Sequence, residues 1–243
     1  MPESPSKIEQ LEQRLRAQYN ELAELAGSLA HEIKNPLSVI RMNMDLLAED
    51  FQAAATPAER RGLAKIQTVQ KQCSRLENLL RDFLKFARLR DLELLPGCLN
   101  EIVERVLDMF APQMREQDVE CFRYLDPALP SIKLDEQTLH AALLNLVKNS
   151  LEAMPGGGQL LVRTRITRSG VALDLIDTGC GMDNRTAMMM FDAFFSTKHQ
   201  GSGLGLPTAQ KIIEAHGGRI SVESEIGHGT QFTIEFPQPA RIR

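Results

Sequence analysis

Two asparagines stand four residues apart in the segment LLNLVKNSLEAM, at Asn145 and Asn149. On a helix this spacing places both amides on one face. Amide oxygens are hard donors, which Mg²⁺ accepts beside waters and phosphate oxygens. Helical asparagines usually face solvent, but the surrounding leucines predict a mostly buried helix, where polar side chains need partners. The pair is therefore a candidate magnesium and phosphate site.

A carboxylate follows shortly afterwards. Asp177 ends an apolar stretch predicted to be a strand, and Gly179 and Gly181 allow the backbone to turn sharply beside it. A carboxylate at the floor of a pocket can accept a hydrogen bond from the exocyclic amine of adenine. The same residues also make ordinary tight turns, so this motif alone is weak.

A third segment, GSGLGL, leads into a helix predicted over Thr208–His216. Glycines that open a helix expose unpaired N–H groups and the positive end of its dipole, which suits an anion. Lys198, in FFSTK, can add positive charge. Neither a P-loop nor a Rossmann fingerprint is present. The candidate phosphate-binding positions of this segment are Gly201, Gly203, Leu204 and Gly205. Thr230, in a last turn, GHGT, is a further candidate for binding the nucleotide, although as a hairpin turn this segment would need no function.

The remaining candidate chemistry lies near the N-terminus, in HEIKNP. His31 falls at a solvent-facing position of a heptad pattern, where an imidazole can accept a phosphoryl group on one ring nitrogen. Glu32 can take the proton from the other nitrogen, and Asn35, one turn on, can orient a water. A surface histidine beside a glutamate is usually only solvated, so His31 needs support from the rest of the chain.

Two seams of apolar residues predict the helices that would carry His31. In the first seam, apolar positions alternate by three and four residues, with Gln18 as the polar exception. The pattern breaks before Thr56-Pro57, where the residues predict a helix start. A second seam with the same spacing follows. An amphipathic helix packing on its own domain is the alternative, but the strict spacing favours a hairpin that forms a homodimeric four-helix bundle. The seams are Ile8, Leu11, Leu15, Leu22, Leu25 and Leu29, then Ile66, Val69, Cys73, Leu76, Leu80, Phe83 and Ala87.

Beyond Leu95-Pro96-Gly97 the pattern changes to mixed helices and strands. The expected fold class is α+β, with the helical hairpin first and an α/β sandwich after it. We expect residues 1–20 to be a coiled-coil helix, 21–94 the dimerisation and phosphotransfer domain, and 95–238 the ATP-binding domain. Helices are predicted over 100–114 and 136–154, and strands over 160–167, 171–177, 219–224 and 231–236.

Composition restricts the class of partner. The chain of 243 residues has 28 Lys and Arg against 32 Asp and Glu, so its net charge of −4 gives no general attraction to nucleic acid. The four cysteines lack metal-ligand spacing, and no apolar run is long enough to span a bilayer. We therefore expect a cytoplasmic chain without membrane insertion and with reduced thiols.

Taken together, these motifs resemble those of two-component sensor histidine kinases over roughly residues 20–237, with SLAHEIKNPLSVI similar to the phosphoacceptor box and FFSTK most similar to the nitrogen-regulation branch. The resemblance implies a dimeric HisKA hairpin and a Bergerat-type ATPase domain that use ATP and Mg²⁺. It makes His31 the phosphoacceptor, Glu32 its base, Asn35 a water-positioning residue and Asn149 the magnesium ligand, with Asn145 facing phosphate. It makes Asp177, Gly179 and Gly181 the adenine site, and Gly201, Gly203 and Gly205 the phosphate-facing glycines of the ATP lid.

The resemblance also implies transfer of the phosphoryl group to an aspartate of a response-regulator receiver domain, together with phosphatase activity towards it. Ala193 departs from the family pattern, which commonly has proline there, and Pro207 interrupts a usual aliphatic run. A nucleotide-sensing scaffold is an alternative. Gyrase-like ATPases are excluded because the stretch before Asn149 lacks their catalytic carboxylate. The input signal, an upstream sensor partner and the choice between cis and trans phosphorylation stay open.

Overall fold

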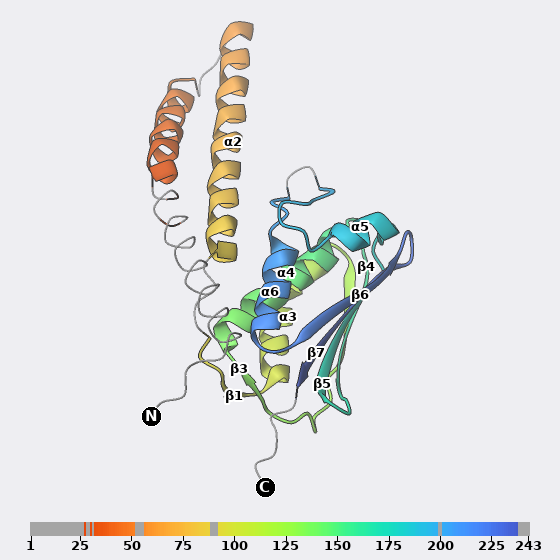
Figure 1. The fold of residues 1–243 in the computed structure, drawn as a ribbon. Helices are drawn as coiled ribbons and strands as arrows, with labels where there is room; N and C mark the ends of the chain where they lie inside the picture. Colours follow the sequence, from red (N-terminus) through yellow and green to blue (C-terminus); the bar gives the residue numbers. More distant parts are fainter. Residues whose placement is uncertain are drawn as a thin grey trace, which may run out of the picture. The chain divides into compact units, whose positions relative to one another are not determined.

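The computed structural model describes residues 27, 30, 32–51, 56–87, 92–198 and 201–237, which fall into two compact units, residues 1–89 and residues 90–243 (Figure 1). Each unit is described by itself. The first heptad seam, at residues 8–29, and His31 lie outside the described residues.

The first unit contains two helices, residues 32–50 and α2 (Pro57–Ala87). The predicted helix start at Thr56 is confirmed by a reciprocal pair of hydrogen bonds. The backbone N–H of Glu59 donates to the Thr56 hydroxyl (3.2 Å), and the backbone N–H of Thr56 donates to the Glu59 carboxylate (2.9 Å). This capping box satisfies two of the N–H groups that a helix end leaves unpaired.

The two helices run antiparallel and are joined by polar contacts along their length. Arg41 pairs with Glu77 at 3.0 Å, and Gln70 donates to Asp45 at 2.7 Å. Between the helices, the side chains of Leu37, Ile66 and Cys73 are buried. The second predicted seam thus divides, since its Ile66 and Cys73 lie inside the hairpin whereas Val69 and Leu76 are exposed. Exposed apolar residues of this unit are Ile33, Val39, Ile40, Met42, Leu46, Leu47, Val69 and Leu76.

The second unit is built on a five-stranded sheet in the order β2-β4-β5-β7-β6. β2 and β4 are parallel and the other neighbours are antiparallel. A separate pair, β1 with β3, is antiparallel. The strands are β1 (Leu95–Gly97), β2 (Val119–Tyr124), β3 (Ile132–Leu134), β4 (Gly158–Ile166), β5 (Gly170–Asp177), β6 (Arg219–Glu225) and β7 (Gly229–Pro237).

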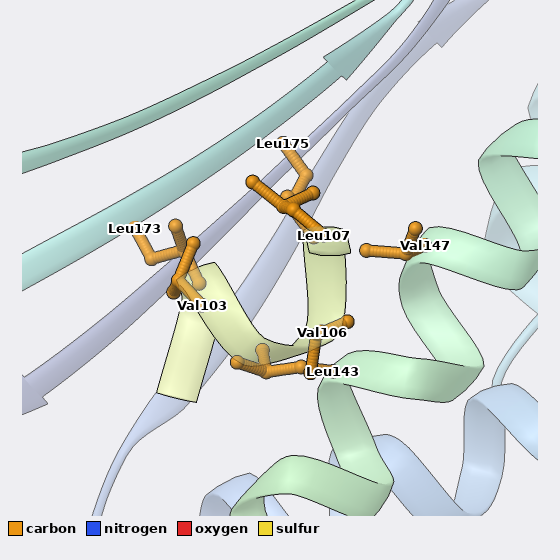
Figure 2. A pocket seen from close by; sticks show the side chains of 7 residues that line it. All are labelled: Val103, Val106, Leu107, Leu143, Val147, Leu173 and Leu175. Carbon is orange, nitrogen blue, oxygen red and sulfur yellow. The ribbon is translucent and has the colours of Figure 1, made fainter. Parts of the chain in front are cut away.

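Three helices, α3 (Leu99–Glu116), α4 (Glu136–Glu152) and α6 (Gly205–Ala215), pack on one face of this sheet, and a short helix, α5 (Asn184–Met189), lies near its β6 side (Figure 1). Side chains of α3, α4 and β5 point toward one another around a small pocket (Figure 2). Every lining residue is aliphatic, so the pocket has no group to hold a phosphate and belongs to the core. The lining residues are Val103, Val106, Leu107, Leu143, Val147, Leu173 and Leu175.

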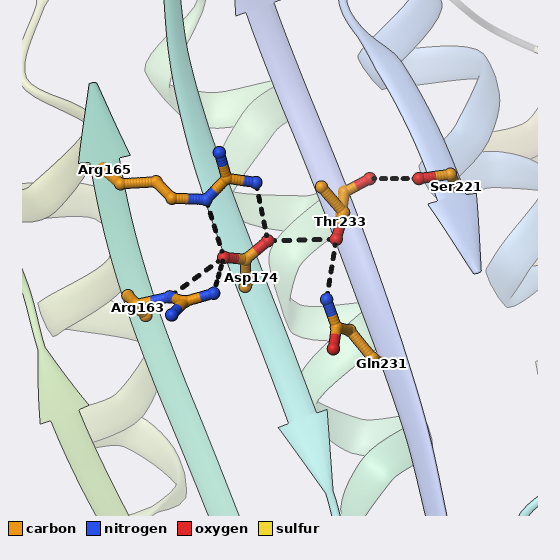
Figure 3. A network of polar contacts seen from close by, with 6 residues as sticks. All are labelled: Arg163, Arg165, Asp174, Ser221, Gln231 and Thr233. Carbon is orange, nitrogen blue, oxygen red and sulfur yellow. Dashed lines mark hydrogen bonds and ion pairs between the residues drawn. The ribbon is translucent and has the colours of Figure 1, made fainter. Parts of the chain in front are cut away.

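The other face of the sheet carries a charged network (Figure 3). Asp174 on β5 is fully buried and accepts hydrogen bonds from Arg163 (2.8 Å) and Arg165 (3.0 Å) on β4 and from the Thr233 hydroxyl (2.9 Å) on β7. Burial alone would raise the pKa of Asp174, but the hydrogen bonds from Arg165, Arg163 and Thr233 outweigh it and lower the pKa. The network therefore joins three strands through one ionised carboxylate.

The helices and strands predicted for the second unit are confirmed, with two corrections. The last helix begins at Gly205 rather than Thr208, because Pro207 fits a first helical turn and Gly205 adopts helical backbone there. The segment Leu95-Pro96-Gly97, predicted only as a break, is strand β1. Strands β2 and β3 and helix α5 were not predicted, since they are short and lack a clear apolar period.

Candidate functional site

Asp177, at the end of β5, is 1% exposed. Its Oδ1 accepts hydrogen bonds from the backbone N–H groups of Gly179 (3.0 Å) and Thr230 (3.2 Å). Its Oδ2 is buried and has no hydrogen-bond partner among the described residues. Burial raises the pKa of this carboxyl, and the Gly179 N–H, the nearby Ser150 hydroxyl, the Thr230 N–H and the charge of Lys198 only partly oppose that effect. An unpaired buried oxygen is costly, so this atom fits a ligand that brings a hydrogen-bond donor.

The glycines around Asp177 are required by close backbone approach. A Cβ on Gly181, whose φ is +64°, would lie 1.9 Å from the carbonyl oxygen of Glu225. A Cβ on Gly229, whose φ is +86°, would lie 1.9 Å from the carbonyl oxygen of Asp177 itself. Gly179 packs on the end of α4, where a Cβ would lie 2.7 Å from that of Ala153. Only glycine permits these contacts, which hold the loop after β5 against the β6–β7 turn.

Thr230 belongs to the same group of residues. It is buried, its backbone N–H reaches Asp177, and its hydroxyl lies 2.9 Å from that of Ser224. Ser224 also accepts from the backbone N–H of Met182 (2.9 Å). The structure thus brings the first and last glycine turns together around the carboxylate of Asp177.

Asn145 and Asn149 lie one turn apart on α4, and both are half-buried. α4 begins at an N-cap, Asp135, whose carboxylate accepts from the backbone N–H of Thr138 (3.0 Å). The start of α6 approaches Asn145, since a Cβ on Gly205 would lie 3.6 Å from Asn145 Oδ1. The asparagine helix and the helix after the glycine segment therefore meet at this point.

The segment between α5 and α6 closes on itself through two backbone contacts. Phe194, with a φ of +68°, donates its N–H to the carbonyl oxygen of Gly203 (3.0 Å). Gly201 donates to the carbonyl oxygen of Lys198 (3.2 Å). Leu204 is 1% exposed, so its side chain is part of the core and only its backbone can face a ligand.

Lys198 reaches from this segment to α4. Its Nζ donates to Asn149 Oδ1 (2.8 Å) and to the Glu152 carboxylate (2.6 Å). Asn149 Oδ1 thus already accepts a positively charged group, which is the property required of a magnesium ligand. Among the described residues no three His, Cys, Asp or Glu side chains gather as a metal site. Sequence reasoning missed Glu152, whose one signal was its position three residues after Asn149.

In the first unit, Glu32 and Asn35 are exposed on the helix of residues 32–50. Both lie on the part of the helix that directly follows His31, which the structure does not describe. Within the described ranges, no helix is long and apolar enough to cross a membrane.

Comparison with known proteins places these features in a family. Residues 21–92 match the His Kinase A (phospho-acceptor) domain, and residues 134–240 match the Histidine kinase-, DNA gyrase B-, and HSP90-like ATPase family. The signal transduction histidine-protein kinase AtoS of Escherichia coli (strain K12) is 34% identical over 93% of this chain. The chain belongs to the sensor histidine kinases. It spans 37% of AtoS and 45% of the sensor histidine kinase ZraS of the same strain.

Solved structures of histidine kinases share the fold. Full-length ShkA in complex with AMPPNP aligns with a TM-score of 0.70 at 29% identity, covering 88% of this chain and 45% of that one. Histidine kinase ThkA in complex with the response regulator protein TrrA aligns with a TM-score of 0.67 at 25% identity, covering 99% of this chain and 70% of that one. The chain is therefore a helical N-terminal region followed by an α/β ATP-binding domain of the Bergerat fold.

Proposed function

We propose that this chain uses Mg-ATP to phosphorylate its own His31 and then passes the phosphoryl group to an aspartate of a response-regulator receiver domain. The observation that carries the proposal is the buried, unpartnered Oδ2 of Asp177 inside a cradle that only glycines can form. That oxygen accepts a hydrogen bond from the exocyclic amine of adenine. Oδ1 keeps its hydrogen bonds from the backbone N–H groups of Gly179 and Thr230.

The phosphates of ATP lie towards α4 and the start of α6 in this proposal. Asn145 and the backbone N–H groups of Gly201, Gly203, Leu204 and Gly205 contact phosphate oxygens, and Lys198 adds positive charge. Asn149 Oδ1 ligates the magnesium ion, which when bound neutralises charge on the phosphates. The residues from Asp183 to Ser202 form a lid that excludes water from the transferred group.

The chemical step is an in-line displacement. A nitrogen of the His31 imidazole attacks the γ-phosphorus, the bond from phosphorus to the bridging oxygen breaks, and ADP leaves. Glu32 takes the proton from the other ring nitrogen, so that the phosphorylated imidazole remains neutral. Bending near Pro36 brings the histidine and the nucleotide together. Asn35 orients a water in the opposing activity, which is hydrolysis of the phosphoryl group from the response regulator.

We assign residues 1–20 to a helix that transmits the signal, 21–94 to dimerisation and phosphotransfer, and 95–238 to catalysis. The division into units at residues 1–89 and 90–243 supports this assignment. The exposed apolar side chains of the hairpin support a homodimer, because a second hairpin covers them in a four-helix bundle. The receiver domain docks on the same bundle, as the complex of ThkA with TrrA suggests for this chain.

Labelling with γ-phosphate-labelled ATP tests the proposal. The unchanged chain should acquire an acid-labile, base-stable label in the presence of Mg²⁺, and His31→Gln should acquire none. His140→Gln, which removes a histidine from α4, is the control and should be labelled. Label retained by His31→Gln would overturn the assigned acceptor. Binding of Mg-ATP without any labelling of the unchanged chain would leave a nucleotide-sensing scaffold.

A further inference from the structure

One ammonium group joins the segment before the glycine-rich stretch to α4. Lys198 Nζ lies 2.8 Å from Asn149 Oδ1 and 2.6 Å from Glu152 Oε2. The two acceptors are three residues apart on α4, so they share one side of the helix. Lys198 is thereby fixed to the helix that carries both asparagines.

The backbone of the lid presents Lys198 for this contact. The Lys198 N–H donates to the Ser196 hydroxyl (3.1 Å), and the Lys198 carbonyl accepts from Gly201 (3.2 Å). On α4, the second carboxylate oxygen of Glu152 lies 3.7 Å from Lys148, four residues before it. Glu152 is therefore held between one lysine of its own helix and one lysine of the lid, with 40% of its side chain exposed.

Asn149 Oδ1 is also the atom assigned above to magnesium, and this inference rests on the proposed function for that assignment. An ammonium hydrogen-bonded to this oxygen and a divalent cation ligated by it would be like charges only a few ångströms apart, so they exclude each other. Lys198 must leave Asn149 before the metal can bind there. Glu152 opposes that departure, because its carboxylate attracts the same ammonium.

We propose that Glu152 and Lys198 form a latch that holds the segment ending at Lys198 on α4 and competes with Mg-nucleotide for Asn149. Glu152 is thus a positioning residue that acts through Lys198. When nucleotide binds, the Lys198 ammonium leaves the oxygens of Asn149 and Glu152 and binds phosphate oxygens instead. The latch lowers the affinity for Mg-nucleotide.

Trypsin tests the latch directly, because it cleaves after Lys198 and needs this side chain released from its partners. In the full chain without nucleotide, Glu152→Gln should raise the initial rate of cleavage after Lys198 about two- to five-fold, the range expected from one partly exposed ion pair. The matched control is Glu136→Gln, which removes a carboxylate of the same helix paired with Arg105, and it should leave this rate unchanged. Raising the salt concentration should accelerate cleavage of the unchanged chain and of Glu136→Gln, but not of Glu152→Gln.

Binding of a fluorescent ATP analogue with Mg²⁺ gives the second measurement. Glu152→Gln should bind about two- to five-fold more tightly, whereas Lys198→Met should release the lid yet bind more weakly, because it also loses a positive charge at the phosphates. Cleavage after Lys198 that is unchanged in Glu152→Gln, or weaker nucleotide binding by that variant, would overturn the latch. Failure of the unchanged chain to bind any nucleotide would instead refute the proposed function, while the cleavage rates would still decide whether the latch exists.

Discussion

The backbone N–H of Asp135 donates a hydrogen bond to Nε2 of His216 across 3.0 Å, and this bond joins the start of α4 to the end of α6. His216 is 5% exposed, and its other ring nitrogen, Nδ1, lies 2.8 Å from the carbonyl oxygen of Ile212. With Nε2 as the acceptor, Nδ1 is the nitrogen that donates to the Ile212 carbonyl. The imidazole therefore joins two helices that also approach each other where α6 begins, beside Asn145.

Replacing His216 by Phe should destabilise the ATP-binding unit. Phenylalanine fills the space beside Phe236 but leaves the N–H of Asp135 and the carbonyl of Ile212 without this partner. A buried group left unpaired costs about 1–3 kcal/mol. Urea denaturation followed by circular dichroism should show a lower midpoint, and an unchanged midpoint would contradict the role given to the imidazole.

Replacing Asp177 by Asn should affect the stability of the fold and the affinity for ATP in different ways. Because burial raises the pKa of Asp177 above its unfolded value, this group stabilises the fold at low pH and loses that contribution as the pH rises through the folded pKa. Asparagine keeps an oxygen for Gly179 and Thr230 and carries no charge. At pH 7 the variant without nucleotide should therefore be at least as stable as the unchanged chain.

The same variant should bind an ATP analogue at least about 100-fold more weakly, since its amide presents a donor to the amine of adenine. Thermal melting without nucleotide and titration with a fluorescent analogue provide the two measurements. A variant that melts lower and binds normally would show that Asp177 has only a structural role.

The Asp174 network predicts acid sensitivity of the sheet. The pKa of Asp174 is lowered in the folded chain, so its contribution is present above the unfolded pKa and is lost as the pH falls through the folded pKa. Asp174→Asn should lower the free energy of unfolding at pH 7 by about 1–3 kcal/mol, less than for a fully buried pair because both arginines are about half exposed. Between pH 4 and pH 3 its stability should fall less than that of the unchanged chain, which urea titrations at each pH will measure.

Two glycines with similar backbone conformation allow the cost of backbone strain to be measured apart from the cost of a steric clash. Gly181 has a φ of +64° and Gly227 a φ of +79°, but a Cβ at Gly227 meets nothing within 4 Å. Gly227→Ala should therefore cost only the backbone strain, about 1 kcal/mol, and retain nucleotide binding. Gly181→Ala should cost more and abolish binding, because the new methyl group collides with the carbonyl of Glu225. Equal melting temperatures and affinities for the two variants would contradict this difference.

Local chemistry explains which features the sequence predicted correctly. The start of α2 depends on Thr56, Pro57 and Glu59, which are adjacent in sequence, and the position of Asp177 depends on the end of an apolar strand. Strand β2 was missed because it is an edge strand with mostly exposed or half-exposed residues, so it shows no apolar run.

Contacts between distant residues were beyond the reach of sequence patterns. Lys198 and Glu152 are 46 residues apart, and neither residue type nor spacing predicts their pairing. The hydrogen bond between Thr230 and Asp177 likewise depends on the register of β5 with β7, which pairs these two residues directly. The unpartnered Oδ2 of Asp177 becomes visible only when all its neighbours are in place.

The backbone contacts of Gly181 and Gly229 also limit how this kinase can be redesigned. Enlarging the pocket to accept bulky purine analogues requires trimming a side chain, and glycine has none to trim. Side chains that can be shortened lie nearby: Met154, whose sulfur is 3.9 Å from the Thr178 hydroxyl, and Thr230, whose hydroxyl is 2.9 Å from that of Ser224. An analogue-sensitive version should therefore be sought by shortening these two residues, with the glycine turns left untouched.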